Sequence, residues 1–446
     1  MRKEQLSGKE QAINPATMLD VMPLSGLQYV IFALCFILNM IDGMDVVILS
    51  YSASSIMADL NITPIQMGGI FSAGLIGMAF GGLILGAYAD KAGRRRIILI
   101  GVTLIAVGVI AGSQAQSISQ LIVTRLIAGF GIGGMFASVT AIVAEYSPLR
   151  IRNIVIMLIT AGYPLGALLT GLSSSWAVPE FGWRATMIGA GSITALMLPI
   201  CFVFLPESLF FLAREGGDGA VRKINRVMGR MKHPEITGPI DSFFDSHGKT
   251  SFRDLLNPQY RRVSLRLWAG LICTFMTMYY LLSWIPKIAI DSGLAPDKAI
   301  IAGAMFSGGG FIGVMVVGLL ANRFGYIRSI VSYCITAFVM MIIFSVYRGE
   351  LTVVLLIAFV MGFTVQGAVG AFYGAAARAY PVQMKSTGIG WTIGVGRIGA
   401  IIGPYFGGIL MSMALPQLVN FTIYGAIMLL GAAFVFPLKS SKVNQI

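Results

Sequence analysis

Two aspartates inside an apolar stretch carry the strongest chemical signal in the chain. Asp42 and Asp45 belong to the segment Asn39-Met40-Ile41-Asp42-Gly43-Met44-Asp45, within an apolar run from 27 to 50 that is long enough to cross a bilayer. A charge at the centre of a membrane helix costs about 3 kcal/mol on insertion scales, so such residues usually face a cavity or a partner. Three positions apart, the acids share one helix face. They indicate an ion or substrate path, unless they lie near the outer end of the span and simply reach water.

Arg125 is a possible partner for these acids. Arg125 and Asp45 each lie about six residues from the outer end of a predicted span, so at about 1.5 Å per residue they sit at similar depth and could pair. An arginine lowers the pKa of a neighbouring acid whereas desolvation raises it, so the balance can be tuned for reversible protonation. Our hypothesis is that Asp42 and Asp45 hold a coupling proton and that Arg125 modulates them. A static ion pair that only fixes helix packing is the alternative.

Arg397 lies near the middle of another apolar run and could receive an anion. Its guanidinium offers a planar fork that binds a carboxylate through two hydrogen bonds. The alternative is a clasp onto helix carbonyls or onto one of the aspartates. Aromatic and amide side chains on neighbouring spans could hold a planar substrate; the candidates are Asn39, Tyr279, Gln366 and Tyr373. Trp284, nearer a span end, is expected to be an interfacial anchor instead.

The composition indicates a membrane protein. The 446 residues are 56% hydrophobic and only 11% charged, with a mean hydropathy of +0.81, whereas soluble domains carry about 25% charged residues. The net charge of +13 follows the membrane topology and does not indicate nucleic-acid binding. The four cysteines lack metal-ligand spacing and both histidines lie in a polar loop, so we expect no metal site, no disulfide framework and no enzyme of the Ser-His-Asp type.

The apolar runs predict an all-α polytopic protein with twelve transmembrane helices. They fall at 27–50, 66–89, 97–115, 118–143, 153–176, 184–205, 263–287, 299–321, 328–346, 351–376, 386–411 and 416–437. This spacing divides the chain into an N-terminal tail, a six-helix bundle, a linker, a second six-helix bundle and a C-terminal tail: 1–26, 27–205, 206–262, 263–437 and 438–446. The basic linker and the lysines and arginines of alternate loops place the linker and both termini in the cytoplasm.

The two halves repeat each other. The segment around Pro148 aligns with that around Pro381 at an offset of 233 residues, and Gly86 to Arg94 has an echo at Gly318 to Tyr326 at an offset of 232. The first offset aligns Pro164 with Arg397, so only the second half carries a charged residue at this position. Internal repeats of this size indicate a transporter whose halves rock about a site near the bilayer midplane.

Three motifs resemble those of known transporters. Two of them resemble signals of the major facilitator superfamily: Gly86-x-x-x-Asp90-Lys91-x-Gly93-Arg94-Arg95 and Pro206-Glu207-Ser208. The resemblance to this superfamily covers essentially the whole chain. Asp42-Gly43-Met44-Asp45, with Gly396-Arg397-Ile398-Gly399, resembles the aromatic acid:proton symporter family within it. The resemblance implies the major facilitator fold, with the first, fourth, seventh and tenth spans lining one cavity. It also implies an inner gate formed by Asp90, Arg94 and Glu145; a solvated charge cluster is the alternative. Because Asn322 replaces the acid of the second loop motif, any gate in the C-terminal half should be weaker.

We therefore expect proton-coupled import of an aromatic carboxylate, such as a benzoate or a hydroxybenzoate, by a multi-pass protein of a cell membrane, in particular a bacterial inner membrane. The expected partners are this small molecule and the bilayer, the coupling ion is the proton, no other cofactor is needed, and the protein acts as a monomer. The alternatives are a carrier of another small organic acid, a drug/proton antiporter or a membrane sensor that binds without translocation. The glycine-rich segment Gly399 to Gly408 resembles an antiporter motif but lies in the eleventh span rather than the fifth, which disfavours export.

Overall fold

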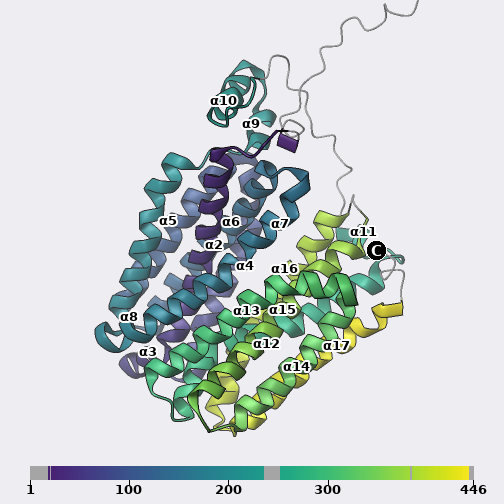
Figure 1. Ribbon diagram of the computed structural model, residues 1–446. Helices are drawn as coiled ribbons and strands as arrows, with labels where there is room; N and C mark the ends of the chain where they lie inside the picture. The colour runs from purple at the N-terminus through teal and green to yellow at the C-terminus, as the bar shows by residue number, and fades with distance from the viewer. Residues whose placement is uncertain (1–18, 21, 236–251, 382–383, 441–446) are drawn as a thin grey trace, which may run out of the picture.

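The computed structural model describes residues 19–20, 22–235, 252–381 and 384–440. The tails 1–26 and 438–446 and the linker 206–262 lie partly outside these residues. Within them the chain folds into helices, which Figure 1 shows in two groups, with short helices at one end of the molecule. The first group contains α2 (Gly26–Tyr51), α3 (Ala53–Leu60), α4 (Pro64–Ala92), α5 (Arg94–Ser113), α6 (Ile118–Tyr146), α7 (Leu149–Thr160) and α8 (Gly162–Phe204).

The remaining helices form the connection and the second group. The connection contains α9 (Leu209–Glu215), α10 (Gly217–Arg230) and α11 (Phe252–Leu255). The second group contains α12 (Arg261–Asp291), α13 (Pro296–Phe324), α14 (Tyr326–Val346), α15 (Leu351–Ala379), α16 (Lys385–Ser412), α17 (Gln417–Val435) and the 3-10 helix η1 (Phe436–Ser440). We call the two groups the N-bundle and the C-bundle, the end of the molecule that carries α9 to α11 the linker end, and the opposite end the α3 end.

Eleven helical segments of the described chain are long and apolar enough to cross a membrane. One of them, Leu149–Phe204, has 56 residues and contains both the fifth and the sixth predicted spans. Helix α8 reverses at Gly182, whose φ of 78° is a conformation that favours glycine. The expectation of twelve spans in an all-α protein is therefore confirmed, although the fifth and sixth spans meet in a glycine turn rather than a loop.

Local sequence sets the helix ends. Ser25 and Gln28 form a reciprocal capping box at the start of α2, and Thr63 and Gln66 form another at the start of α4. Helix α4 ends at Gly93, with a φ of 97°, and α13 ends at Gly325, with a φ of 89°. These two glycines occupy repeat-related positions, so the two halves share the backbone conformation of this turn as well as its sequence.

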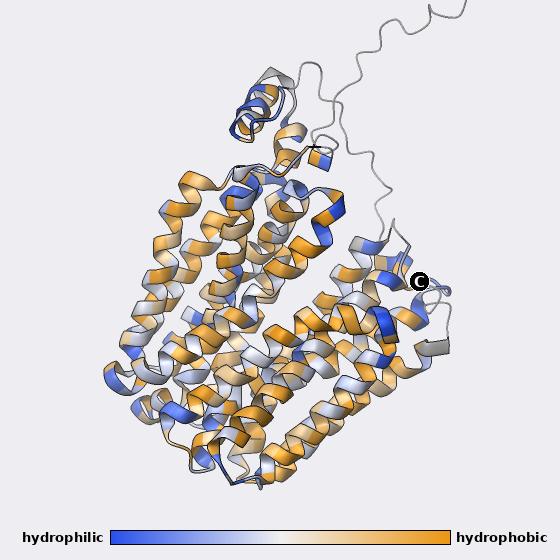
Figure 2. Cartoon of the chain, viewed as in Figure 1, coloured by the Kyte–Doolittle hydropathy of each residue, from blue (hydrophilic) through white to orange (hydrophobic). Residues whose placement is uncertain are grey.

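Hydrophobic side chains cover the outside of the bundles between the two ends. Figure 2 shows hydrophobic residues along the helices and hydrophilic ones gathered at the linker end and in the loops of the α3 end. Large apolar side chains such as Leu83, Leu196, Leu319 and Leu356 are exposed on the helices. In water such a surface would be unfavourable, whereas in lipid it meets hydrocarbon. The chain is therefore a multi-pass membrane protein.

The two bundles contact each other toward the α3 end. Ser50, in the last turn of α2, donates to the carbonyls of Leu282 and Ser283 in α12, at 2.7 and 2.8 Å. Ser72 of α4 donates to the Ile401 carbonyl of α16 at 2.6 Å. Figure 1 shows the bundles converging at this end and diverging toward the linker end.

Candidate functional site

A cavity of about 110 Å³ lies between the two bundles, at mid-length of their helices. Every residue predicted to bind substrate lines it, together with Asp42: Asn39 and Asp42 from α2, Tyr279 from α12, Gln366 and Tyr373 from α15, and Arg397 from α16. The structure thus brings together side chains that are more than 300 positions apart in the sequence. Because both bundles contribute to it, any rocking of one bundle against the other must change its shape.

The charged residues of this cavity come from opposite bundles. Asp42 belongs to the N-bundle and is 3% exposed, whereas Arg397 belongs to the C-bundle and is half-buried. Arg397 interacts electrostatically with Asp42, but among the described residues it has no ion pair within 4.0 Å and no hydrogen bond. A cation without a direct partner in a largely apolar cavity is suited to an anionic ligand. Pro164, its counterpart in the repeat, also lines the cavity.

Aromatic rings form much of the C-bundle wall. Phe275 packs edge-on against Tyr279, with ring centroids 5.7 Å apart, and against Tyr373 at 6.5 Å. Across the cavity, the N-bundle contributes Tyr163, which interacts with Tyr279. These rings offer flat apolar surfaces to a planar ligand. The sequence analysis missed Tyr163 and Phe275 as lining residues; only the repeat relation of the adjacent Pro164 to Arg397 could have pointed to Tyr163.

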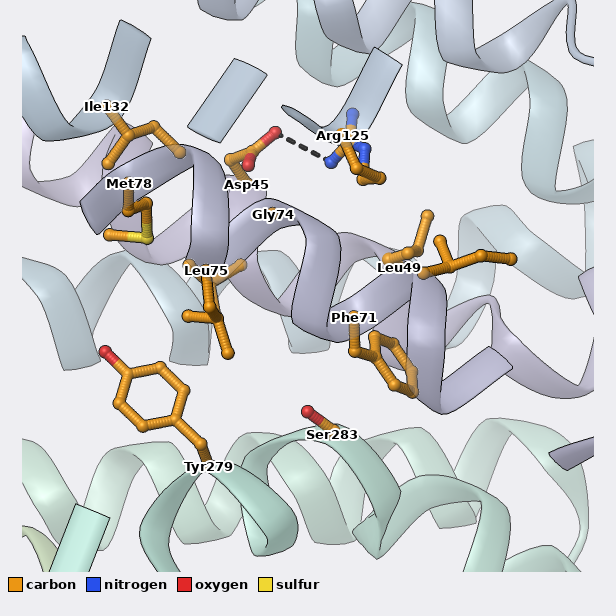
Figure 3. Close-up of a pocket in the computed structure, with 12 residues that line it drawn as sticks. Asp45, Leu49, Phe71, Gly74, Leu75, Met78, Arg125, Ile132, Tyr279 and Ser283 are labelled. Atoms are coloured by element: carbon orange, nitrogen blue, oxygen red, sulfur yellow. Dashed lines mark hydrogen bonds and ion pairs between the residues drawn. The ribbon is translucent and has the colours of Figure 1, made fainter. Parts of the chain in front are cut away.

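Asp45 and Arg125 form the expected ion pair, away from the central cavity. Arg125 Nη1 lies 3.0 Å from Asp45 Oδ1, and the two side chains are only 4% and 7% exposed. They line a separate pocket of about 30 Å³, shown in Figure 3, which Tyr279 and Ser283 of the C-bundle close on the far side. Met78 and Tyr279 line both this pocket and the central cavity. The two aspartates are thus neighbours on α2 with different surroundings.

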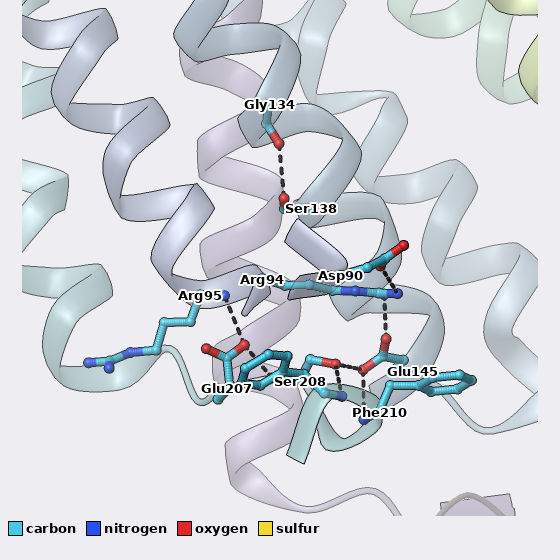
Figure 4. Close-up of polar contacts among 10 residues, drawn as sticks. Asp90, Arg94, Arg95, Gly134, Ser138, Glu145, Glu207, Ser208 and Phe210 are labelled. Carbon is cyan, nitrogen blue, oxygen red and sulfur yellow. Dashed lines mark hydrogen bonds and ion pairs between the residues drawn. The ribbon is translucent and has the colours of Figure 1, made fainter. Parts of the chain in front are cut away.

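Asp90, Arg94 and Glu145 meet at the linker end of the N-bundle. Arg94 pairs with Glu145 and lies 3.6 Å from Asp90, one turn earlier on the chain (Figure 4). Two further residues of this network, Glu207 and Ser208, were recognised in the sequence only as part of a motif and not as partners of these charges. Ser208 Oγ donates to Glu145 at 2.5 Å, and Glu207 accepts a hydrogen bond from the Arg95 amide at 3.0 Å. The network thereby ties α4, α5 and α6 to the start of the linker.

The repeat-related position in the C-bundle holds a weaker version of this contact. Arg378 Nη2 donates to Asn322 Oδ1 at 2.9 Å, and these residues align with Glu145 and Asp90 in the repeat. In the N-bundle the two acids at these positions are bridged by Arg94. In the C-bundle Tyr326 occupies the position of Arg94, and Arg378 bonds a neutral amide directly instead of forming an ion pair.

One prediction is wrong. Trp284, expected as an interfacial anchor, is fully buried, and its indole Nε1 donates to the Pro404 carbonyl at 2.9 Å. Its ring packs edge-on against Phe71 of the N-bundle, with centroids 5.4 Å apart. Trp284 therefore belongs to the contact between the bundles at the α3 end. A sequence position near a span end could not distinguish a lipid-facing tryptophan from one that faces the other bundle.

The described residues contain no group of three or more histidine, cysteine or acidic side chains placed to hold a metal ion.

Comparisons with known proteins give a consistent picture. The model of the Major Facilitator Superfamily matches residues 35–372 and 267–445. A gallate transporter from Pseudomonas putida is 30% identical, over 91% of this chain and 91% of that protein. A 4-hydroxybenzoate transporter from the same organism is 29% identical, over 90% of each. A benzoate transport protein from Acinetobacter baylyi is 29% identical, over 97% of this chain and 94% of that protein.

Solved structures share the fold. A xylose transporter from E. coli in a partially occluded inward open conformation superposes with a TM-score of 0.71 at 16% identity, covering 93% of this chain and 98% of that chain. A bacterial homologue of the lysosomal transporter Spinster, in an inward-facing and unoccupied conformation, gives the same TM-score and identity, covering 92% and 97%.

Proposed function

This chain belongs to the major facilitator superfamily, and from that premise we propose that it imports an aromatic carboxylate together with protons. Transporters of gallate, 4-hydroxybenzoate and benzoate are its relatives at 29 to 30% identity over nine-tenths of the chain. The observation that carries the proposal is Arg397, which lines a cavity walled by aromatic rings and has no ion pair among the described residues. A planar acid would place its carboxylate on this guanidinium and its ring among Tyr163, Tyr279 and Tyr373.

The N-bundle supplies the groups for proton coupling. Asp42 faces the cavity and Asp45 is held by Arg125 in the neighbouring pocket. In the proposed cycle, protonation of either Asp42 or Asp45 leaves one carboxylate to balance Arg125 in the N-bundle, while the substrate anion balances Arg397 in the C-bundle. The loaded protein then has few uncompensated charges at the midplane, which lowers the cost of closing the cavity between the bundles.

The linker end would face the cytoplasm of a bacterial inner membrane. Arginine and lysine concentrate there, in the last turn of α4, the first turns of α5 and α7, and along α10. The contacts between the bundles lie at the α3 end, so the cavity would open toward the linker end. With the linker end in the cytoplasm, this arrangement corresponds to an inward-facing state. The network of Asp90, Arg94 and Glu145 lies within the N-bundle and is already formed in this state. It would stabilise the opposite state by presenting its charges to the C-bundle when the linker end closes. One chain supplies both walls of the cavity, so a monomer is sufficient.

Uptake into proteoliposomes tests this function. Purified protein in sealed vesicles is given labelled benzoate or 4-hydroxybenzoate, with and without an inwardly directed proton gradient. We expect accumulation above the external concentration that collapses when a protonophore is added. Accumulation that is unchanged by the protonophore would contradict proton coupling. Saturable binding without accumulation would contradict transport and indicate a sensor.

A further inference from the structure

Two buried amides in the central cavity have hydrogen-bonding atoms without protein partners. Asn39 of the N-bundle and Gln366 of the C-bundle are each 3% exposed and line the same cavity as Arg397. Among the described residues, Asn39 Oδ1 and Gln366 Nε2 have no hydrogen-bond partner. A buried polar atom left without a hydrogen bond is destabilising, so the presence of two such atoms on opposite walls of a binding cavity requires an explanation.

Packing holds both amides in place. The side chain of Gln366 lies against Gly310 of α13, where a Cβ would overlap the amide group itself. Asn39 lies against Gly162 of α8, where a Cβ would be 3.3 Å from the Asn39 Cβ. Because neighbouring helices confine these side chains, neither amide can easily turn away to reach water. They are preorganised groups in the lining of the cavity, and a ligand that enters the cavity is the partner that we consider for them.

The chemistry of the two atoms matches a hydroxyl group. A phenolic hydroxyl donates one hydrogen bond and accepts another, and the cavity offers an unpartnered acceptor at Asn39 and an unpartnered donor at Gln366. The substrate carboxylate has its own receptor in Arg397, which lines the same cavity as Tyr279 and Tyr373. We propose that Asn39 and Gln366 together read a ring hydroxyl of the substrate, so that the carrier selects a hydroxylated aromatic acid over its unsubstituted parent. This inference rests on the proposed function.

The physical basis of this selection is the penalty for the wrong ligand. Benzoate would fill the cavity and satisfy Arg397 but would leave both amide atoms desolvated and unpaired. A site built to bond a hydroxyl discriminates strongly against an analogue that lacks it, whereas an apolar pocket discriminates weakly against an added hydroxyl. The proposal therefore predicts a preference that shape alone would not produce.

Equilibrium binding to the purified protein, without a proton gradient, tests the proposal. The probes are labelled benzoate, 3-hydroxybenzoate and 4-hydroxybenzoate at one pH. We expect the better of the two hydroxybenzoates to bind about 10- to 100-fold more tightly than benzoate. In Gln366→Met and in Asn39→Leu, which keep the side-chain size but remove the amide, this ratio should fall to about threefold or less, with benzoate affinity unchanged or higher. Thr364→Val is the matched control, because Thr364 is buried on α15 and bonds carbonyls of its own helix.

Two results would overturn the proposal. One is a wild-type ratio close to one, which needs no variant and so does not depend on how well the variants fold. The other is an equal loss of affinity for all three acids in the amide variants, which would assign the amides to the carboxylate or to packing. Failure of the proposed function is recognised separately, as absence of gradient-driven accumulation of any of the three acids in vesicles.

Discussion

At the scale of single residues, the two arginines of the site differ: Arg125 forms an ion pair, whereas Arg397 is available to bind an anion. Arg125 is held by Asp45 at 3.0 Å, with both side chains buried, whereas Arg397 lines a cavity and has no ion pair among the described residues. The two arginines therefore should respond differently to substitution, and each aspartate should respond according to the arginine it faces.

Replacing Arg397 by lysine separates substrate recognition from a clasp. Lysine keeps the charge but loses the planar fork, so we expect substrate affinity to fall about 10- to 100-fold, measured by binding to the purified protein. Arg328→Lys, at the exposed linker end, is the control and should change nothing. Nearly unchanged affinity in Arg397→Lys would favour the clasp that the sequence left open.

Replacing Asp45 by asparagine removes the proposed proton carrier. We expect protonophore-sensitive accumulation to be lost while substrate binding remains, because Asp45 lies outside the substrate cavity and a neutral side chain cannot exchange a proton. Uptake into vesicles with a proton gradient and binding without one measure the two effects. Asp59→Asn, an acid paired with Arg184 at the α3 end, is the control. Proton-driven uptake that survives in Asp45→Asn would contradict the coupling role.

At the scale of elements, close helix contacts fix where the acids stand. Gly43 lies between Asp42 and Asp45, and a Cβ there would overlap the Tyr163 carbonyl of α8. Helix α2 thus approaches α8 as closely as glycine permits, which sets the position of both acids relative to the cavity.

Gly43→Ala should therefore be destabilising. We expect a loss of about 1 to 3 kcal/mol in the free energy of unfolding, the usual cost of overpacking, seen as a lower thermal unfolding midpoint in detergent. Gly69→Ala on α4 is the matched control, since no atom lies within 4 Å of its Cβ, and it should be neutral or slightly stabilising. Equal midpoints for the two variants would mean that α2 and α8 can move apart without cost.

The sequence predicted most of this element scale and less of the site. The spans and the repeat could be recognised because hydropathy and a constant offset can be read directly from the sequence. The break between the fifth and sixth spans was predicted as well, and the structure adds that a single glycine, Gly182, makes the reversal. The burial of Trp284 and the place of Tyr163 were missed because both depend on which face of a helix meets the other bundle, and single-sequence patterns do not contain that contact.

At the scale of the whole molecule, hydrogen bonds hold the bundles together at the α3 end. Ser50 and Ser72 both donate across the interface to backbone carbonyls. Since those carbonyls belong to helices, removing the hydroxyls leaves few groups unsatisfied.

The double variant Ser50→Ala/Ser72→Ala should weaken this closure. Bonds of this kind between membrane helices contribute about 0.6 kcal/mol each, so the equilibrium should shift about fivefold to tenfold toward opening at the α3 end. Distances between spin labels placed across that end would measure the shift. Ser138→Ala is the control, because Ser138 bonds Gly134 within α6 (Figure 4). Unchanged distance distributions in the double variant would assign the closure to packing alone.

The separation of charges between the bundles also has an electrical consequence. Asp42 and Asp45 move with the N-bundle, whereas Arg397, opposite Pro164 in the repeat, moves with the C-bundle. Rocking therefore displaces opposite charges relative to one another within the membrane, where one elementary charge crossing a potential of 100 mV is worth about 2.3 kcal/mol. Even a single reorientation without turnover would therefore displace charge within the membrane. With vesicles adsorbed on a solid electrode, addition of substrate should produce a measurable transient current.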